Sequence, residues 1–396
     1  MENAFEGEGN EHEVFSVGDF EVRESGIGGN SIKDDLILLS ALGQGAGGIV
    51  YKAIHRPTMR IVAVKTIPAY DPRKRAQMLK ELKALSANRA PIEGGDTEPV
   101  PKSGDEDDVP TPCPFIVTFH DAYINAEQCN VSIVVEYMDG GSLQDILDIG
   151  GCENEDILSQ ICYRILRGFK FLHSARQIHR DIKPANLLIN HRGEVKISDF
   201  GIVRELESTQ AMANTFVGTL TYMSPERISG HAYSANSDIW SFGLSIMSLA
   251  LGTYPLNTTG GYWALLSSLN DNSVPSLPQD RFSMEFIDFI DRCLQREPRK
   301  RPDTDELLEH PFILRTRASV DAQMEHGENV PPTNDDDNIK ELTEIFAGYC
   351  RVVPEKIDPS KLSTLSKQFG VSLDIVQAKY EEAFEGQQQE EPPVSN

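Results

Sequence analysis

Residues 178–190 read IHRDIKPANLLIN, a polar cluster with apolar residues on both sides. The apolar flanks predict that the backbone enters and leaves a hydrophobic core, so that the polar side chains between them face a cleft. Asp181 can accept the proton of an attacking hydroxyl, Lys183 can neutralise charge on a moving phosphoryl group, and Asn186 can bind a divalent ion. Asp199, in VKISDFG, follows as a second metal-binding group. Phosphoryl transfer requires these positioning and charge-neutralising parts.

Upstream, LGQGAGGIV at 42–50 carries glycines in GxGxxG spacing. This spacing also occurs in dinucleotide-binding turns, but there a helix follows, whereas here a second strand comes next. The context favours a glycine-rich hairpin over nucleotide phosphates, because a Cβ would hold the backbone away from them. For the glycines alone, a simple hairpin is the alternative. The residues assigned to nucleotide binding are Leu42, Gly43, Gln44, Gly45, Ala46, Gly47, Gly48, Ile49 and Val50.

Lys65 ends the apolar run VAVK, which predicts a lysine at a defined place on a sheet below that hairpin. Glu81 lies on the next predicted helix and is the natural carboxylate to orient it. Their pairing would fix Lys65 against the α- and β-phosphates. For either residue taken alone, a surface position is the alternative.

The length of 396 residues predicts a two-lobed unit with tails, or two domains. Strand-like runs come first and a mostly helical region follows from about 142 to 313, so we expect an α+β fold. The predicted parts are a mostly disordered lead-in (1–35), a main domain (36–313) with a flexible acidic insertion (89–112), an acidic linker (314–337), a small helical appendage (338–385) and a disordered tail (386–396).

The net charge of −24 is concentrated in peripheral segments. Residues 1–35 carry two basic and ten acidic groups, residues 89–112 two and seven, and residues 314–396 eight and sixteen. This acidity argues against nucleic-acid and anionic-membrane binding. No apolar run is long enough to span a bilayer, and the start MENAFEGEGN has no signal-peptide pattern. The six cysteines are scattered, so we expect free thiols, a cytoplasmic location, and the nucleus as a further compartment.

The ordered set GxGxxG, VAVK, HRDIKPAN, DFG and SPE resembles the eukaryotic protein kinase family over residues of about 36 to 313. The resemblance implies a bilobal fold, with a small β-rich N-lobe, a larger helical C-lobe and a short helical C-terminal appendage, and the use of ATP and Mg²⁺. It implies that Asp181 is the catalytic base, assisted by Lys183 and Lys65, and that Asn186 and Asp199 hold Mg²⁺.

The same resemblance implies that adenine contacts the backbone of a hinge, Glu136-Tyr137-Met138. Val135 would be the gatekeeper before this hinge, and Ala63 would belong to the nucleotide site. Two further roles are structural. Asp238 of SDIW would be a buried anchor, and Arg301 would pair with Glu226 of SPE.

More narrowly, EYMDGGSL, INHRGEVKISDFG, ANTFVGT, YMSPERISG and HPFI resemble the MAP kinase kinase family, and plant-type members are the most similar. That family phosphorylates a Thr and a Tyr in the activation loop of a MAP kinase and is itself activated by a MAP kinase kinase kinase. A Ser/Thr kinase of a related branch and a pseudokinase scaffold are the alternatives. No basic docking motif of the kind found in family members precedes the main domain.

Residues 207–219, ESTQAMANTFVGT, are rich in hydroxyls. Thr209 and Thr215 are separated by five residues, which resembles the acceptor spacing of plant-type members, and Ser208 is a neighbouring alternative for the first acceptor. A phosphate adds about −1.5 to −2 charges and needs a guanidinium partner to order a loop. Arg180 is the expected partner. The other interpretation of Ser208 and Thr209 is that they are loop hydroxyls without a role.

Overall fold

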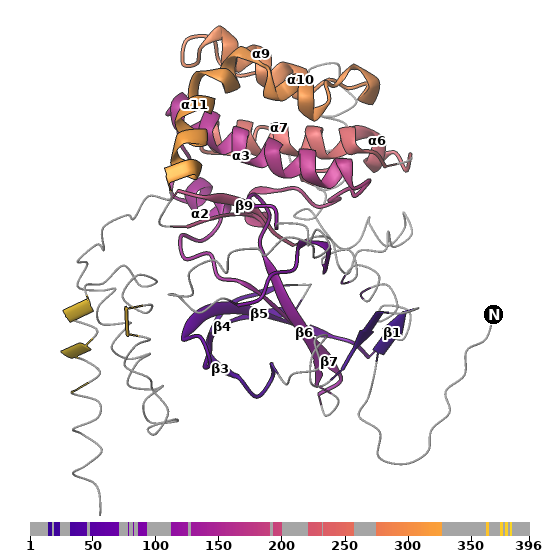
Figure 1. Ribbon diagram of the computed structural model, residues 1–396. Coiled ribbons are helices and arrows are strands. Elements are labelled where there is room, and N and C mark those ends of the chain that lie inside the picture. Colours follow the sequence, from indigo (N-terminus) through magenta and orange to yellow (C-terminus); the bar gives the residue numbers. More distant parts are fainter. Residues whose placement is uncertain are drawn as a thin grey trace, which may run out of the picture. The chain divides into compact units, whose positions relative to one another are not determined.

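A computed structural model describes the chain in two compact units. The first comprises Met1–Thr111, Phe119–Tyr137 and Asn329–Asn396, and the second comprises Pro112–Thr118 and Met138–Glu328. The first unit is built on a β-sheet and the second is mainly helical, which confirms the predicted α+β class (Figure 1). Within these units the structure describes residues 15–17, 20–23, 32–45, 48–70, 78, 82, 86–92, 112–125, 128–190, 193–199, 221–231, 233–256 and 275–326, with isolated positions between 362 and 381.

The first unit contains a five-stranded antiparallel sheet with the order β3-β4-β5-β7-β6. The strands consist of apolar runs or of alternating apolar and polar residues, as the sequence predicts. They bury a small cluster of side chains that includes Val62, Val64 and Val134. β5 is the central strand and has a hydrogen-bonded neighbour on each side, so residues on it have a fixed position in the sheet. The strands are β3 (Leu36–Gly45), β4 (Gly48–His55), β5 (Arg60–Pro68), β6 (Phe119–Asn125) and β7 (Asn130–Glu136).

The lead-in departs from the expected disorder. β1 (Phe15–Val17) and β2 (Phe20–Val22) form an antiparallel pair. Val22 is fully buried, and the carbonyl of Arg23 accepts a hydrogen bond of 3.1 Å from the N–H of Ile124 in β6. The acidic composition masks the apolar Val22, and the backbone bond of Arg23 attaches the segment to the edge strand of the sheet.

The helix predicted after β5 is described only at Met78 and Leu82. Both are helical, and they are 2% and 0% exposed, as expected for two positions on one buried helix face. The short 3-10 helix η1 (Ser86–Asn88) follows. At the start of the predicted 89–112 insertion, residues 89–92 are described, and the N–H of Ala90 donates to the carbonyl of Phe119. Residues 93–111 lie outside the described residues.

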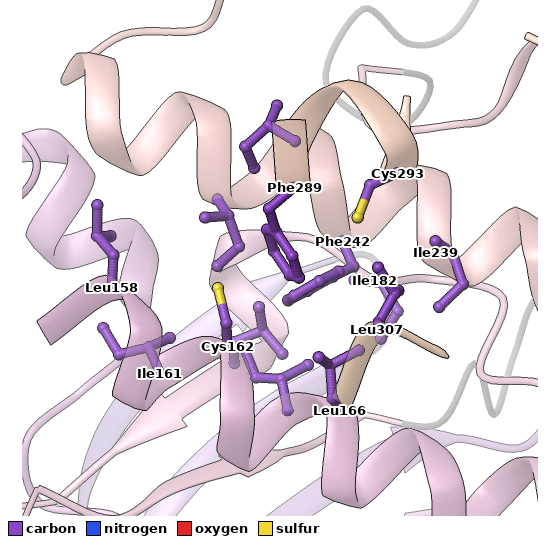
Figure 2. Close-up of a cluster of buried hydrophobic side chains, with 14 of the residues drawn as sticks. Leu158, Ile161, Cys162, Leu166, Ile182, Ile239, Phe242, Phe289, Cys293 and Leu307 are labelled. Atoms are coloured by element: carbon purple, nitrogen blue, oxygen red, sulfur yellow. The ribbon is translucent and has the colours of Figure 1, made fainter. Parts of the chain in front are cut away.

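The second unit packs its helices around a single large core. Phe242 of α7 (Ala235–Leu251) and Phe289 of α9 (Met284–Cys293) meet edge to face with ring centroids 6.1 Å apart. Cys162 of α3 (Glu155–Ser174) and Cys293 of α9 lie beside them (Figure 2). Each large side chain buried in this way contributes roughly 1.5–3 kcal/mol. The helices that the structure describes in this unit are α2 (Leu143–Asp148), α3 (Glu155–Ser174), α6 (Pro225–Ile228), α7 (Ala235–Leu251), α9 (Met284–Cys293), α10 (Thr304–Leu308) and α11 (Pro311–His326). Shorter elements are η2 (Pro184–Asn186), η3 (Pro298–Lys300), β8 (Leu187–Ile189) and β9 (Val195–Ile197).

The α7 helix is buried almost throughout, although it carries several serines. The hydroxyls of Ser241, Ser245 and Ser248 each donate to the backbone carbonyl four residues earlier. Because a buried hydroxyl without a partner is costly, this back-bonding allows serines inside the core. The helix can therefore pass through the centre of the unit and carry Asp238 with it.

The helix α11 crosses the predicted boundary at residue 313 and continues to His326. Its residues pack on α3: Ser159 and Thr316 share a hydrogen bond of 2.7 Å, Tyr163 donates to Asp321 at 2.6 Å, and Val320 is fully buried. Residues 314–326 are therefore part of the second unit and not of a linker. Charged residues on the outer side of this helix give it the composition of a solvated segment.

The predicted appendage at 338–385 is described only at isolated positions, of which Leu362 is helical and 4% exposed. The tail at 386–396 lies outside the described residues, so both boundaries stay predictions. None of the helices in the described part of the chain is long and apolar enough to cross a membrane. The five cysteines that the structure describes are free thiols, as expected.

Candidate active site

The loop that leads from α3 to η2 is held from below by Asp238 of α7. This carboxylate is completely buried and accepts hydrogen bonds from the backbone N–H groups of His179, at 2.8 Å, and Arg180, at 3.0 Å. The predicted role of Asp238 as a buried anchor is confirmed. Because the anchor sits on α7, which is buried along most of its length, the position of the loop is tied to the core.

The imidazole of His179 links the same loop to the end of β9. Its Nε2 lies 2.7 Å from the carbonyl of Ser198, and since a carbonyl can only accept, Nε2 carries the proton. Its Nδ1 then accepts from the backbone N–H of Asp181 at 3.3 Å. His179 is 1% exposed, so this ring serves as a fixed internal strut between the loop and β9.

Three of the predicted residues meet at the carboxylate of Asp181. Its Oδ2 lies 3.2 Å from Lys183 Nζ and accepts a hydrogen bond of 3.0 Å from Asn186 Nδ2. The same Nδ2 donates to the backbone carbonyl of Asp181 at 2.7 Å. A carboxylate bound by an ammonium and an amide is held in a fixed direction. Such a group can receive the proton of a substrate hydroxyl.

Asn186 and Asp199 suit a divalent metal ion. Both side-chain hydrogen bonds of Asn186 to Asp181 use Nδ2, so the amide oxygen Oδ1 is directed away from Asp181. The backbone carbonyl of Asn186 accepts from the N–H of Ser198 at 2.9 Å, and Ser198 precedes Asp199. Amide and carboxylate oxygens are the donors that Mg²⁺ prefers. In the described ranges there is no group of three or more His, Cys, Asp or Glu side chains of the kind that holds a metal. Two protein donors still fit Mg²⁺, which keeps several waters or phosphate oxygens.

Arg180 and Asp199 both have left-handed backbone, with φ of 71° and 52°. Non-glycine residues adopt this conformation rarely, and it persists only where surrounding contacts impose it. For Arg180 these contacts are visible. Its N–H is bound by Asp238, and its carbonyl accepts a hydrogen bond from Nη1 of Arg227.

The first unit carries the predicted nucleotide residues on its central strands. Lys65 of β5 lies opposite Val50 of β4 and Ile133 of β7 in the sheet register. Ala63, two residues earlier on the same face, lies opposite Val135 and is 8% exposed. Glu136 is the last residue of β7, and Met138, the first residue of the second unit after it, is buried. Glu81 lies outside the described residues, and its pairing with Lys65 stays a prediction.

The glycine-rich stretch is a strand-to-strand hairpin. Gln44 pairs with Ile49 and Gly45 with Gly48, which excludes the strand-to-helix turn of a dinucleotide fold. Leu42 of β3 is 46% exposed, and Ala46 and Gly47 lie outside the described residues.

Two glycines of this hairpin have different reasons to be glycine. Gly48 has φ of 118°, and a Cβ there would lie 2.1 Å from the carbonyl oxygen of Thr66 on β5. A Cβ on Gly43 would meet no atom within 4 Å. Gly48 is therefore required by the sheet itself, whereas the surroundings of Gly43 leave room for a ligand to approach the backbone.

The predicted pair of Glu226 and Arg301 is confirmed. The two Nη atoms of Arg301 bind one carboxylate oxygen each at 2.8 Å, and Ser237 Oγ donates to Glu226 at 2.7 Å. Burial opposes the charge of Glu226, but the bonds from Arg301 outweigh it and lower the pKa of this carboxyl to about 2. The pair holds the start of α6 against η3.

Two residues near the site were not found from the sequence. Arg227 follows the SPE motif and contacts the Arg180 carbonyl, and the ring of Tyr233 lies 4.7 Å below the Arg227 guanidinium. Nothing in their spacing signals these contacts. The predicted acceptors Ser208, Thr209 and Thr215 lie outside the described residues, and the chain is described again from Thr221, whose carbonyl accepts from the Tyr254 hydroxyl.

Comparison with known proteins agrees with these features. Residues 110–313 match the model of the protein kinase domain family. The chain is 42% identical over 282 residues to mitogen-activated protein kinase kinase 3 of Arabidopsis thaliana, which covers 71% of this chain and 50% of that protein. It is 38% identical over 286 residues to mitogen-activated protein kinase kinase 1 of Arabidopsis thaliana, covering 70% of this chain and 74% of that protein.

An animal protein is also similar. The dual specificity mitogen-activated protein kinase kinase dSOR1 of Drosophila melanogaster is 38% identical over 307 residues, which covers 71% of each chain. The chain thus spans about half of the length of the first of these relatives and about three quarters of the second.

Proposed function

The chain belongs to the MAP kinase kinase family of protein kinases, and from this we propose that it transfers the γ-phosphate of ATP to a Thr and a Tyr in the activation loop of a MAP kinase. The observation that carries the proposal is the arrangement at Asp181, whose carboxylate is held by Lys183 and Asn186 on a loop fixed by Asp238.

In the proposed reaction Asp181 accepts the proton of the substrate hydroxyl. The hydroxyl oxygen forms a bond to the γ-phosphorus, the bond from that phosphorus to the β,γ-bridging oxygen breaks, and ADP leaves. Lys183, which lies 3.2 Å from Asp181, neutralises charge on the moving phosphoryl group. Asn186 and Asp199 would hold Mg²⁺, which when bound supplies further positive charge to the phosphates.

On the first unit, the β3–β4 hairpin contributes backbone N–H groups to the phosphates, and Lys65 contributes an ammonium from the centre of β5. Backbone groups at Glu136 and Met138 bind adenine, where Val135 and Ala63 limit the space available. These assignments rest on the resemblance of the motifs, and the register of the sheet supports them by placing Ala63 opposite Val135.

Activation depends on a second kinase in this proposal. An upstream MAP kinase kinase kinase phosphorylates Thr215 together with Thr209 or Ser208, and the guanidinium of Arg180 binds the added phosphate. Arg180 suits this role because its backbone is already fixed on both sides, which leaves only its side chain to respond.

The test uses the full chain with Thr209→Glu and Thr215→Glu, incubated with ATP, Mg²⁺ and a MAP kinase whose own catalytic base has been removed. Phosphate on both the Thr and the Tyr of the substrate is expected. Phosphothreonine alone would instead indicate a Ser/Thr kinase of a related branch.

Two control variants make this test specific. Asp181→Ala in the same background should abolish both products while ATP affinity is kept, because Asp181 acts on the hydroxyl proton. Thr209→Ala with Thr215→Ala should be as well folded but inactive after treatment with an upstream kinase. If signalling in cells survives Asp181→Ala intact, the chain acts as a scaffold and the proposed activity is wrong.

A further inference from the structure

Both backbone polar groups of Arg180 are bound by side chains from elsewhere in the second unit. Its N–H donates to Asp238 Oδ1 at 3.0 Å, and its carbonyl accepts from Nη1 of Arg227. Between these two bonds the residue has φ of 71°, a conformation that an arginine does not adopt without external support. The bond from Arg227 is thus one of the two described contacts that impose this backbone shape.

Tyr233 completes a closed ring of contacts. The Arg227 guanidinium lies over the aromatic ring of Tyr233, with Cζ 4.7 Å from the ring centroid. The Tyr233 hydroxyl donates to Asp238 Oδ1 at 3.0 Å, and the same oxygen accepts from the N–H of Arg180. Burial raises the pKa of Tyr233, and the Asp238 carboxylate raises it further, so the phenol stays protonated and keeps donating. The closed cycle of contacts therefore runs from Arg180 through Arg227, Tyr233 and Asp238 back to Arg180.

We propose that Arg227 and Tyr233 are positioning residues for phosphoryl transfer. They hold Arg180 in its left-handed conformation, and through it they set the direction of the next residue, Asp181, and the exit direction of the Arg180 side chain. The proposal deepens the proposed function and rests on it for the roles of Asp181 and Arg180. It adds a path by which α6, which carries Arg227, affects Arg180 and Asp181.

The chemistry of the two side chains fits this role. A guanidinium is planar, so it can stack on an aromatic ring with one face and still donate in its own plane to a carbonyl. A lysine at position 227 keeps the positive charge but cannot stack and donate in this geometry together. A phenylalanine at position 233 keeps the ring below Arg227 and removes only the bond to Asp238.

The first experiment therefore compares Arg227→Lys and Tyr233→Phe with two matched controls. Arg281→Lys changes an arginine that also stacks on a ring, at 5.3 Å from Phe282, and pairs with Glu153 at 2.7 Å. Tyr163→Phe changes a tyrosine whose hydroxyl also donates to a carboxylate, Asp321, at 2.6 Å. All four variants are made in the full chain with the activating substitutions, and kcat, KM for ATP and the melting temperature are measured.

We expect Arg227→Lys to lower kcat by on the order of 10- to 100-fold, because a small misplacement of a catalytic group has effects of this size. KM for ATP should change by less than about twofold, since nucleotide binding does not use Asp181. Tyr233→Phe should lower kcat less, and the double variant should lose no more than Arg227→Lys alone, because both act through Arg180. The two controls should keep kcat.

A second measurement does not depend on activity. Amide hydrogen exchange of the segment 176–184 should be several-fold faster in Arg227→Lys than in the parent chain and unchanged in Arg281→Lys. Faster exchange with lowered kcat supports the proposal. Unchanged exchange in Arg227→Lys, an unchanged kcat, or additive losses in the double variant would each overturn it.

The two proposals can fail separately. If the parent chain phosphorylates no MAP kinase but phosphorylates a general protein substrate, the proposed MAP kinase kinase function fails, and the same kcat comparison on that general substrate still decides the role of Arg227. If the parent is inactive on every substrate, both its kinase activity and the positioning role are refuted, and the exchange result then reports only a structural contact.

Discussion

Arg301 donates two hydrogen bonds of 2.8 Å to the carboxylate of Glu226, and the Arg301 side chain is completely buried. Arg301 also donates to the carbonyls of Gln295, at 2.7 Å, and Asn236, at 2.8 Å. Because the guanidinium is saturated by acceptors from three segments, it connects α6, α7 and the loop before η3. The pair is thus a fastening between elements and is not part of the chemistry at Asp181.

Replacing Arg301 by Met should destabilise the second unit by about 3–5 kcal/mol, because Glu226 would remain buried without its partner. Arg281→Met is the matched control, since its pair with Glu153 is exposed and should cost less than about 1 kcal/mol. Denaturant unfolding of both variants measures the difference. Equal losses in the two variants would show that burial of the pair has no special weight.

The same pair predicts a dependence of stability on pH. The pKa of Glu226 falls from its ordinary value of 4.5 to about 2 in the folded chain, so folding favours the ionised form. This contribution to stability is fully present above 4.5 and is lost as the pH falls from 4.5 towards 2. The difference in unfolding free energy between the parent and Glu226→Gln should therefore shrink over that range. A difference that stays constant with pH would contradict the assignment.

Two glycine substitutions in one hairpin should separate folding from ligand binding. Gly48→Ala should destabilise the first unit by about 1–3 kcal/mol or more, because the new Cβ meets the Thr66 carbonyl and the backbone has positive φ. Gly43→Ala should leave the melting temperature within a degree or so of the parent but raise KM for ATP. Thermal unfolding and steady-state kinetics test both. A Gly43→Ala variant with unchanged KM would remove this hairpin edge from the nucleotide site.

The end of α11 should matter for folding. A chain that stops after Ile313 loses Val320 from the core and leaves Tyr163 without its acceptor Asp321, so we expect a loss on the order of 3 kcal/mol. A chain that stops after Glu328 keeps both contacts and should match the full chain in the stability of the second unit. Denaturant unfolding of these two truncations, read by the core of the second unit, makes the comparison.

The catalytic loop could be predicted from the sequence because its chemistry is local. Asp181, Lys183 and Asn186 lie within six residues, so their side chains meet as soon as the loop turns. The strands β5 and β7 could be predicted for a similar reason, since their apolar runs reflect burial in the sheet. The buried anchor Asp238 and the pair of Glu226 and Arg301 followed only from the family resemblance, because the partners are far apart in the chain.

The remaining contacts depend on tertiary packing that local patterns do not encode. Arg227 contacts Arg180 although the two residues are 47 positions apart in the sequence. Taken alone, each arginine is of a type that is usually found on a solvated surface. The continuation of α11 was hidden because its exposed side carries charge while Thr316 and Val320 are buried. In the lead-in, Val22 is one apolar residue among acidic neighbours, and only the edge of β6 shows why it is buried.

The two buried thiols in the core of the second unit can report how often α3 and α9 separate. Cys162 and Cys293 are both 0% exposed, and burial raises the pKa of each thiol, so neither can react with a disulfide reagent while α3 and α9 stay packed (Figure 2). Cys129, at the turn before β7, is exposed and is the contrasting thiol. The labelling rate of Cys162 and Cys293, read separately from the labelling of the other cysteines, then reports the transient separation of α3 and α9.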